Sequence, residues 1–379
     1  MPENNALRAV VIDSGTDSIK AGFSGDAAPR VVFPNLVGWP KQSAVMAGTA
    51  RKGVYVGAEA LAESDILTLS YPIARGPIFD WDDLTTVWRH TFADQLRINP
   101  QEHPVLLTEP PLITKHNREQ MARVMFETFR VPALFIADSS VAAMHAFGRG
   151  TGLVVDIGSV ATTVTPIHEG NSIDHAVRRL NVGGTLLTFY LSQLLLEIGL
   201  DLQKSIADLD FVREIKERLC YVAENYDKEL ERTQSNPDLM SIPKLSKGKP
   251  IEIRSERFTC PEQLFRPSYL GEHGPGLPAV IDESIRTCDP DLWKTLYGNI
   301  ILSGGTSLLT GLPERLTAEL TRLAPPDHPI NVVTPPSRQY SSWIGASRLS
   351  ARPTFSHRWI TKAAYDENGP TLLWPEHRF

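Results

Sequence analysis

Two stretches of the chain share one pattern of hydrophobic and polar positions. The first passes from an apolar, β-branched run (10–12) through a polar turn that begins at Asp13 into a second strand-like run (18–23). The second repeats this outline with an apolar run (153–155), a turn that begins at Asp156 and a further run (162–164). An apolar run, a glycine-containing polar turn and another apolar run predict a β-hairpin. We therefore predict two similar hairpins in one chain.

The residues at the two turns suit a metal-bound polyphosphate. Glycine lets the backbone approach an anion closely, and each turn has one, Gly15 and Gly158. An aspartate at the end of a buried strand can hold a divalent cation directly or through water. Either hairpin alone reads as an ordinary part of an α/β protein. The repetition favours the other interpretation, in which the two hairpins face each other and bind one nucleotide from both sides.

A third segment has the same kind of chemistry. An apolar strand ends in Ser303-Gly304-Gly305-Thr306 and runs into a helix-like stretch. A strand, a glycine-rich turn and a helix start form a common place for backbone amides to meet a nucleotide. Following the two hairpins, this segment strengthens the prediction of a nucleotide site.

From end to end, these and other stretches resemble actin and the actin-related proteins, with no large insertion or deletion. The matching stretches include Lys20-Ala21-Gly22-Phe23, Ala28-Pro29-Arg30, Tyr55-Val56-Gly57, Trp81-Asp82-Asp83, Leu302-Ser303-Gly304-Gly305-Thr306, Trp343-Ile344-Gly345 and Tyr365-Asp366-Glu367.

The resemblance implies an α/β fold of the duplicated actin, hexokinase and chaperone ATPase type. Such a fold has two lobes, each with a smaller inserted subdomain, and a nucleotide cleft between the lobes. The first lobe core would comprise residues 1–34, 72–140 and 341–379, with an inserted subdomain at 35–71 that carries a mobile loop. The second lobe core would comprise 141–182 and 272–340, with 183–271 inserted.

The resemblance also assigns the residues of the site, with ATP or ADP and Mg²⁺ as cofactors. Asp13 and Asp156 would hold the metal through water. The implied nucleotide-binding residues are Ser14, Gly15, Thr16, Lys20, Gly158, Gly184, Lys216, Glu217, Gly304, Gly305 and Thr306. Outside this context, Lys20, Lys216 and Glu217 would read as solvated surface charges.

The residues implied for ATP hydrolysis are replaced. The glutamine that positions the attacking water in actin corresponds to Ser139, and the histidine that relays the proton corresponds to Thr163. Serine is too short to orient that water, and threonine does not accept a proton near neutral pH. Asp138 is a remote substitute base. We therefore expect very weak ATPase activity or none, and no residue is assigned as catalytic.

Other differences from actin lie beside the predicted nucleotide. In the second turn, Ser159 and Val160 replace an aspartate and a glycine, and Val160 is expected to disturb the turn if the backbone there needs a positive φ. Near the ribose, Thr185-Leu186 replaces an Arg-Asp pair. These changes are expected to weaken nucleotide binding relative to actin.

Composition and charge narrow the functional classes. With 42% hydrophobic and 22% charged residues, the chain reads as a globular protein large enough for two domains. Its net charge of −6 argues against a direct nucleic-acid or anionic-membrane binder and is compatible with basic partners. Three cysteines without metal-ligand spacing fit a reducing compartment. The expected location is cytoplasmic, at the cytoskeleton, with a nuclear location possible.

Two surface segments bear on polymerisation. The stretch 42–52 keeps an apolar tip around Val45 and Met46, which suits insertion into a neighbouring subunit. The stretch 266–276 places Glu272, His273 and Gly274 where actin has an apolar tip. An unpaired carboxylate is costly to bury in a filament. Long homofilaments are therefore not expected, and other actin-family subunits or complex-specific proteins are the expected partners.

Three functions fit these observations. The first is a structural subunit of a cytoskeletal complex, dynactin-like or otherwise actin-like, that binds ATP or ADP. The second is a nuclear actin-related subunit of a chromatin-remodelling complex, although those members often carry long insertions. The third is an active ATPase or phosphotransferase of the same superfamily, which the replaced groups at Ser139 and Thr163 disfavour.

Overall fold

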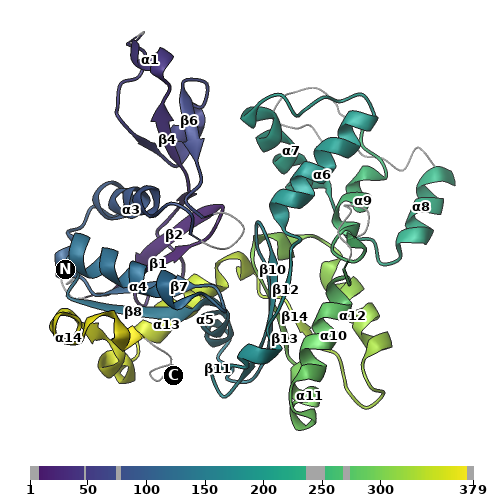
Figure 1. Ribbon diagram of the computed structural model, residues 1–379. Helices are drawn as coiled ribbons and strands as arrows, with labels where there is room; N and C mark the ends of the chain where they lie inside the picture. Colours follow the sequence, from purple (N-terminus) through teal and green to yellow (C-terminus); the bar gives the residue numbers. More distant parts are fainter. Residues whose placement is uncertain (1–7, 47, 74–77, 236–251, 268–273, 374–379) are drawn as a thin grey trace, which may run out of the picture. The chain divides into compact units, whose positions relative to one another are not determined.

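A computed structural model describes residues 8–46, 48–73, 78–235, 252–267 and 274–373 of the chain. The chain divides into two compact units (Figure 1). The first consists of Met1–Thr151, Ile167–Asp174 and Tyr340–Phe379, and the second of Gly152–Pro166 and His175–Gln339. No helix in the described part of the chain is long and apolar enough to cross a membrane.

The first unit is built on a six-stranded sheet with the order β15-β8-β7-β1-β2-β3. Strand β1 pairs antiparallel with β2 and parallel with β7, and β7 pairs parallel with β8. The strands are β1 (Val10–Ser14), β2 (Ser18–Phe23), β3 (Val31–Pro34), β7 (Val105–Glu109), β8 (Ala133–Asp138) and β15 (Ile360–Thr361). Since β1, β7 and β8 run in parallel, their carboxyl ends lie along one edge, where Asp13 is found.

Both faces of this sheet are covered by apolar side chains. Val10 and Ile12 belong to one buried cluster and Val11 to another, which also contains Trp343. This arrangement explains why β1 reads as a continuous apolar run rather than an alternating one. The helices of the unit are α3 (Trp81–His90), α4 (Lys115–Arg123), α5 (Ser139–Ala146), α13 (Ser341–Ser350) and α14 (Lys362–Asn368).

Helices α5 and α13 pack tightly against each other on the sheet (Figure 1). A Cβ atom on Gly345 would lie 1.6 Å from the carbonyl oxygen of Ala142, so only glycine fits at this crossing. Helix α5 begins where β8 ends, because the Asp138 carboxylate accepts hydrogen bonds from the N–H groups of Ser140 and Val141.

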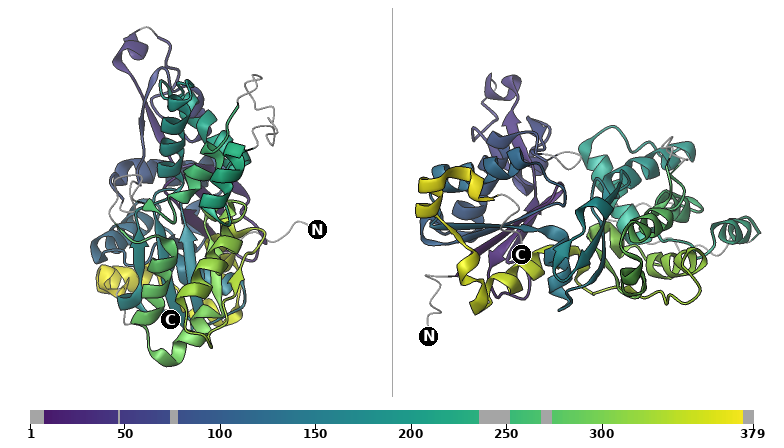
Figure 2. Two further views of the ribbon diagram at one scale, coloured as in Figure 1. Left: turned by 90° about the vertical axis from the view of Figure 1, so that its right-hand side faces the viewer. Right: turned by 60° about the horizontal axis from the view of Figure 1, so that its bottom comes forward.

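A smaller three-stranded sheet with the order β5-β4-β6 forms its own part of the first unit. It contains β4 (Val37–Pro40), β5 (Tyr55–Val56) and β6 (Leu67–Ser70), with the short helices α1 (Gln42–Met46) and α2 (Ala58–Ala62). It has a separate small core of Leu36, Tyr55, Ala60 and Leu67. Drawn in purple, it projects away from the six-stranded sheet in Figure 1 and in both views of Figure 2.

The second unit repeats the hairpin-and-parallel-strand plan of the first. Strand β13 pairs in parallel with both β9 and β14, and β9 is followed in its sheet by β10, which β12 joins. The strands are β9 (Gly152–Ile157), β10 (Thr162–His168), β12 (Arg178–Leu180), β13 (Ile300–Ser303) and β14 (Val332–Val333). The last residues of β10 pair with β11 (Asn171–Ser172) and fall in the first unit.

Helices make up most of the rest of the second unit. They are α6 (Gly184–Glu197), α7 (Ile206–Leu219), α8 (Tyr226–Ser235), α9 (Glu256–Glu262), α10 (Leu277–Thr287), α11 (Pro290–Tyr297) and α12 (Leu312–Leu323). Helix α6 packs on α7 and α9, while α10 packs on α11 and α12.

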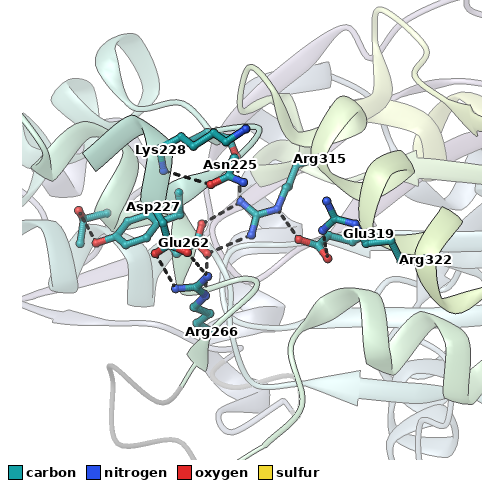
Figure 3. A network of polar contacts seen from close by, with 11 residues as sticks. Asn225, Asp227, Lys228, Glu262, Arg266, Arg315, Glu319 and Arg322 are labelled. Atoms are coloured by element: carbon teal, nitrogen blue, oxygen red, sulfur yellow. Dashed lines mark hydrogen bonds and ion pairs between the residues drawn. The ribbon is translucent and has the colours of Figure 1, made fainter. Parts of the chain in front are cut away.

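A buried network of charges ties α9 to α12 (Figure 3). Two guanidinium nitrogens of Arg315 lie 3.2 and 3.3 Å from the carboxylate oxygens of Glu262, and Nε of Arg266 lies 3.4 Å from the same carboxylate. Burial raises the pKa of Glu262, although both arginines oppose this shift. Arg315 also bonds the carbonyl of Ala223 and the carboxylate of Glu319. Glu262 and Arg315, the two buried members, each have a second charged partner, Arg266 and Glu319 respectively, so the network does not depend on one ion pair alone.

Both predicted hairpins are confirmed, as β1–β2 and β9–β10. The predicted loop at 42–52 begins with one helical turn, α1, because the carbonyl of Lys41 accepts the N–H groups of Ala44 and Val45. The helix predicted directly after Thr306 begins later, at Leu312, and a 3₁₀ segment, Gly305–Leu308, intervenes. Glu272 and His273, on which the polymerisation argument depends, lie outside the described residues.

Candidate functional site

The first hairpin brings a carboxylate and an ammonium group together. Asp13 and Lys20 are direct partners in the β1–β2 register, and Nζ of Lys20 lies 3.6 Å from Oδ2 of Asp13. The hydroxyl of Thr108, at the end of β7, donates to Oδ1 of Asp13 over 2.6 Å. Both charged side chains are mostly but not fully buried, with 16% exposed. The pair is therefore held in place and still reachable from solvent.

The turn of the first hairpin is fixed by its neighbours. The indole N–H of Trp88 donates to Oγ of Ser14 over 3.0 Å, so the hydroxyl proton of Ser14 can still be donated to another group. The fully buried Asn35 donates from Nδ2 to the carbonyl of Gly15 and from its backbone N–H to the carbonyl of Asp17. A Cβ atom on Gly15 would lie 3.0 Å from Nζ of Lys20. Thr16 is half-buried in the same turn.

The second hairpin is held by backbone groups. Its turn closes with a hydrogen bond from the N–H of Gly158 to the carbonyl of Ala161, 3.0 Å long. The carbonyl of Gly158 accepts the N–H of Gly184 over 3.0 Å and the hydroxyl of Thr306 over 2.8 Å. Asp156, half-buried, is the register partner of Ser303 on β13. Three segments that are distant in the sequence thus meet at Gly158.

Glycines make this meeting possible. Gly304 has φ +85°, and a Cβ atom there would lie 2.3 Å from the carbonyl oxygen of Ile157. A Cβ atom on Gly184 would lie 2.6 Å from the hydroxyl of Thr306. Gly305, by contrast, is exposed and has no atom within 4 Å of such a position. Gly304 therefore sets the geometry of the turn, whereas Gly305 leaves open space.

Lys216 is buried rather than solvated. Its ammonium donates to the carbonyl of Gly184 over 2.7 Å and to the hydroxyl of Thr188 over 2.8 Å. The residue is 7% exposed, and burial lowers the pKa of its ammonium. In this structure Lys216 fixes the start of α6, while the adjacent Glu217 is exposed.

Two of the replaced residues contact each other. The hydroxyls of Ser159 and Thr185 lie 2.7 Å apart, and the N–H of Thr185 donates to the carbonyl of Ser159 over 2.7 Å. The hairpin turn and the first turn of α6 are thereby joined. Val160 is not among the described non-glycine residues with positive φ, so the turn accepts its β-branched side chain without that strain.

One replaced hydrolytic residue lies in each unit. Ser139 is the first residue of α5 in the first unit, and Thr163 lies on β10 opposite Arg179 in the second. Asp138, the remote substitute base, caps α5 with its carboxylate.

Each unit thus collects part of the predicted site. The first gathers Asp13, Ser14, Gly15 and Lys20, and the second gathers Gly158, Gly184, Lys216, Gly304 and Thr306. Among the residues that the structure describes, no three His, Cys, Asp or Glu side chains cluster as a metal site. The sequence prediction missed Thr108, Trp88, Asn35 and Thr188. Of these, only Thr108 had a readable signal, as a polar residue that ends an apolar strand.

The donors present fit a magnesium-bound phosphate. The first hairpin offers a carboxylate oxygen, an ammonium and a hydroxyl, which are the groups that bind Mg²⁺ and phosphate oxygens. In the second unit, Gly304 follows β13 at a position where a side chain would collide with the backbone of β9. The fold, two hairpins that each pair with a parallel strand, defines an actin-like α/β protein. The family model described as Actin matches residues 4–376, and the chain belongs to the actin family.

Proposed function

We propose that this protein binds ATP or ADP with Mg²⁺ and uses residues of both hairpins to do so. Members of the actin family generally bind this cofactor. The observation that supports the proposal most is the cluster of Asp13, Lys20 and Ser14, in which charge and hydrogen-bond donors are already fixed for a phosphate. The magnesium ion would neutralise phosphate charge when bound.

The residues of the first hairpin have distinct roles in this proposal. Asp13, oriented by Thr108, would hold the metal through water, and Asp156 of the second hairpin would do the same. Lys20 acts on the phosphates as a point charge. The hydroxyl of Ser14 accepts from Trp88 and still has its proton, which it would donate to a phosphate oxygen.

The second unit contributes shape more than charge. Gly304 and Thr306 form the turn against which the nucleotide lies, and Thr306 keeps this turn fixed to Gly158. Lys216 positions Gly184 by bonding its carbonyl, so its effect on the nucleotide is exerted through the backbone. Glu217 is exposed and available to the adenosine.

We further propose that the nucleotide is a structural cofactor and that the protein is a subunit of a cytoskeletal, dynactin-like or other actin-like complex in the cytoplasm. Two observations support this. Ser139 and Thr163 lack the groups that position water and relay a proton, and the family model matches residues 4–376, nearly the whole chain. Its partners would be other actin-family subunits or complex-specific proteins.

A thermal-shift experiment tests the binding proposal. A ligand that binds only the folded state raises the melting temperature with the logarithm of its concentration above Kd. We expect Mg–ATP or Mg–ADP at about 1 mM, well above a micromolar Kd, to stabilise the protein. A chelator should reduce this shift.

Two matched variants make the test specific. Asp13→Asn keeps the shape of the side chain and removes the charge that faces the metal, so the magnesium-dependent shift should be lost. Asp17→Asn makes the same change at an exposed position of the same turn and should retain the shift. Absence of any shift in the wild type, or equal shifts in both variants, would contradict the proposed site.

A further inference from the structure

Helix α6 of the second unit is apolar on both of its faces. Residues 184–196 contain no charged side chain, and Glu197 ends the helix. One face is buried where the helix packs on α7 and α9, with Leu187, Leu191 and Leu195 fully enclosed. A helix at the surface of a globular protein ordinarily has charged or polar residues on its other face. Helix α6 therefore has the composition of a helix that is covered on both sides.

The second face of α6 is nevertheless exposed. Phe189 is 50% exposed and Leu196 is 46% exposed, and Gln193 between them is exposed as well. Spacings of four and three residues place these side chains on one stripe of a helix. Single apolar residues scattered over a surface are ordinary, whereas these follow one line. We refer to Phe189, Gln193 and Leu196 as the outer stripe of α6.

Helix α6 is held in its unit by residues outside the outer stripe. The ammonium of Lys216 donates to the hydroxyl of Thr188 over 2.8 Å, and the thiol of Cys260 donates to the carbonyl of Leu187 over 3.3 Å. These bonds come from α7 and α9 and lie on the buried side. Side chains of the outer stripe can therefore be replaced while the packing of the helix is kept.

After Glu197 the chain returns along α6. Nε2 of Gln203 donates to the hydroxyl of Ser192 over 3.2 Å, so this return lies against the middle of the helix. Helix α7 begins directly afterwards and packs beside α6 (Figure 1). Charged residues of the return and of the first turn of α7 therefore border the C-terminal half of the outer stripe.

This border is mainly acidic. Glu197 and Asp201 are exposed, and Asp208 lies in the first turn of α7. Lys204 is the one cation within residues 197–208, all of which the structure describes, and its ammonium lies 2.8 Å from the carboxylate of Asp201. Three carboxylates against one ammonium leave two negative charges in excess. We refer to these four residues as the acidic border.

The shape and charge of this surface indicate its partner. An apolar stripe with helical spacing suits the apolar stripe of a second helix, which packs along it. The acidic border favours a helix whose stripe is flanked by lysine and arginine. A second copy of this chain would bring the same acidic border against its own, and an anionic membrane would be repelled as well. We propose that the outer stripe of α6 docks a basic amphipathic helix of a partner protein.

The test uses the full-length protein and a defined probe. The probe is a fluorescent peptide with leucines at helical spacing on one face and lysines at the flanking positions. One counterpart has the same residues in scrambled order, and another has glutamate in place of every lysine. Binding is measured by fluorescence anisotropy for the wild type, Phe189→Gln, Leu196→Gln and the double variant. The control is Leu323→Gln, at a 40% exposed leucine that ends α12.

We expect the lysine peptide to bind the wild type and both counterparts to bind far more weakly. Phe189→Gln and Leu196→Gln should each weaken binding about tenfold, as is typical of a side chain at the centre of an interface. Leu323→Gln should leave the affinity unchanged. A melting curve shows that each variant is folded, and the Mg–ATP melting shift should be the same in all of them, so nucleotide binding is scored separately.

The acidic border is tested by a second matched pair. Glu197→Gln removes one carboxylate beside the outer stripe, and Glu367→Gln makes the same change at an exposed position of α14 in the first unit. Glu197→Gln should weaken binding of the lysine peptide about threefold at low salt, as for an exposed ion pair, and added salt should reduce this difference. Glu367→Gln should have no effect. Equal affinities of these two variants at low salt would contradict the role of the acidic border.

Other results would overturn the proposal as a whole. These are equal binding of the lysine peptide by Leu196→Gln and Leu323→Gln, binding of the scrambled peptide as tight as that of the probe, and failure of the probe to bind at all. A dimer in light scattering that Leu196→Gln abolishes would assign the outer stripe to a second copy of this chain. Binding to phosphatidylcholine vesicles that the same change abolishes would assign it to a membrane.

Discussion

The two hairpins share a backbone plan but differ in what holds them. In the first, charged and polar side chains fix the turn: Lys20 pairs with Asp13, and Trp88 bonds Ser14. In the second, the carbonyl of Gly158 is the centre of a mainly backbone network with Gly184 and Thr306. The same plan is thus stabilised by charge in one unit and by close backbone packing in the other.

This difference suggests a division of work. The charged pair of Asp13 and Lys20 is partly exposed, so each side chain can give up part of its interaction with the other and interact with a bound ligand instead. A backbone network that depends on glycine at Gly304 cannot rearrange without strain. Changes in the first hairpin should therefore alter ligand binding more than folding, and changes in the second should alter folding as well.

The largest expected effect is on the rate of ATP hydrolysis, when the missing hydrolytic groups are restored. This change tests whether the site can still support hydrolysis. The wild type should release phosphate much more slowly than conventional actin in a single turnover. The combined change Ser139→Gln and Thr163→His should raise that rate by about 10²–10⁴-fold if only these groups are missing. Each single change should have a smaller effect. An actin-like rate in the wild type would show that another group, such as Asp138, replaces them.

Gly304 and Gly305 form a matched pair that tests the packing of the second hairpin. Gly304→Ala places a Cβ atom 2.3 Å from the carbonyl oxygen of Ile157 at φ +85°, and should destabilise the fold by about 2–4 kcal/mol. Gly305→Ala meets no atom within 4 Å and should change stability by less than about 0.5 kcal/mol. Denaturant unfolding of both variants measures the difference. Equal denaturant midpoints for the two variants would mean that the turn at Gly304 accommodates the added methyl group.

Lys216 is expected to make a smaller contribution to the free energy of unfolding, and this contribution depends on pH. Burial lowers the pKa of its ammonium below 10.5, so between the lowered value and 10.5 the unfolded chain binds more protons than the folded one. The contribution of Lys216 to stability therefore rises with pH across this window, by at most about 1.4 kcal/mol per pH unit. The difference in unfolding free energy between the wild type and Lys216→Met should increase as the pH is raised toward 10.5.

The control for this measurement is a lysine with the opposite shift. The ammonium of Lys204 donates a hydrogen bond to the carboxylate of Asp201, which raises the pKa of this exposed lysine, so Lys204→Met should show no such increase. If the difference for Lys216→Met stayed constant with pH, the ammonium would be better solvated than its position in the structure indicates.

The sequence predicted the elements of the fold better than the contacts among them. The hairpins were readable because each combines apolar runs with a glycine-containing turn. The pairing of Ser14 with Trp88 was not, because the two residues are 74 positions apart and no pattern in either segment refers to the other. Lys216 looked like a surface residue of a helix, and only the packing of α7 on α6 buries it.

Apolar composition was also an incomplete guide. Residues 184–196 carry no charge and indicate a buried helix, whereas the fold leaves Phe189 and Leu196 exposed. Both faces of α6 are apolar, so the sequence cannot predict which of them packs on α7 and α9. The exposed face becomes visible only when the helix is placed in space.

The most direct test of the central claim, that nucleotide-binding residues of each unit contribute to Mg–ATP binding, is the affinity for Mg–ATP of the wild type, Lys20→Met, Thr306→Val and the double variant, measured by calorimetry. Each single change should weaken binding about tenfold or more, equivalent to about 1.4 kcal/mol. Lys41 is an exposed lysine in the same unit as Lys20, and its ammonium donates to the carbonyl of Asp65. The control change Lys41→Met should leave the affinity for Mg–ATP unchanged. Unchanged affinity in either Lys20→Met or Thr306→Val, in a folded protein, would contradict the account.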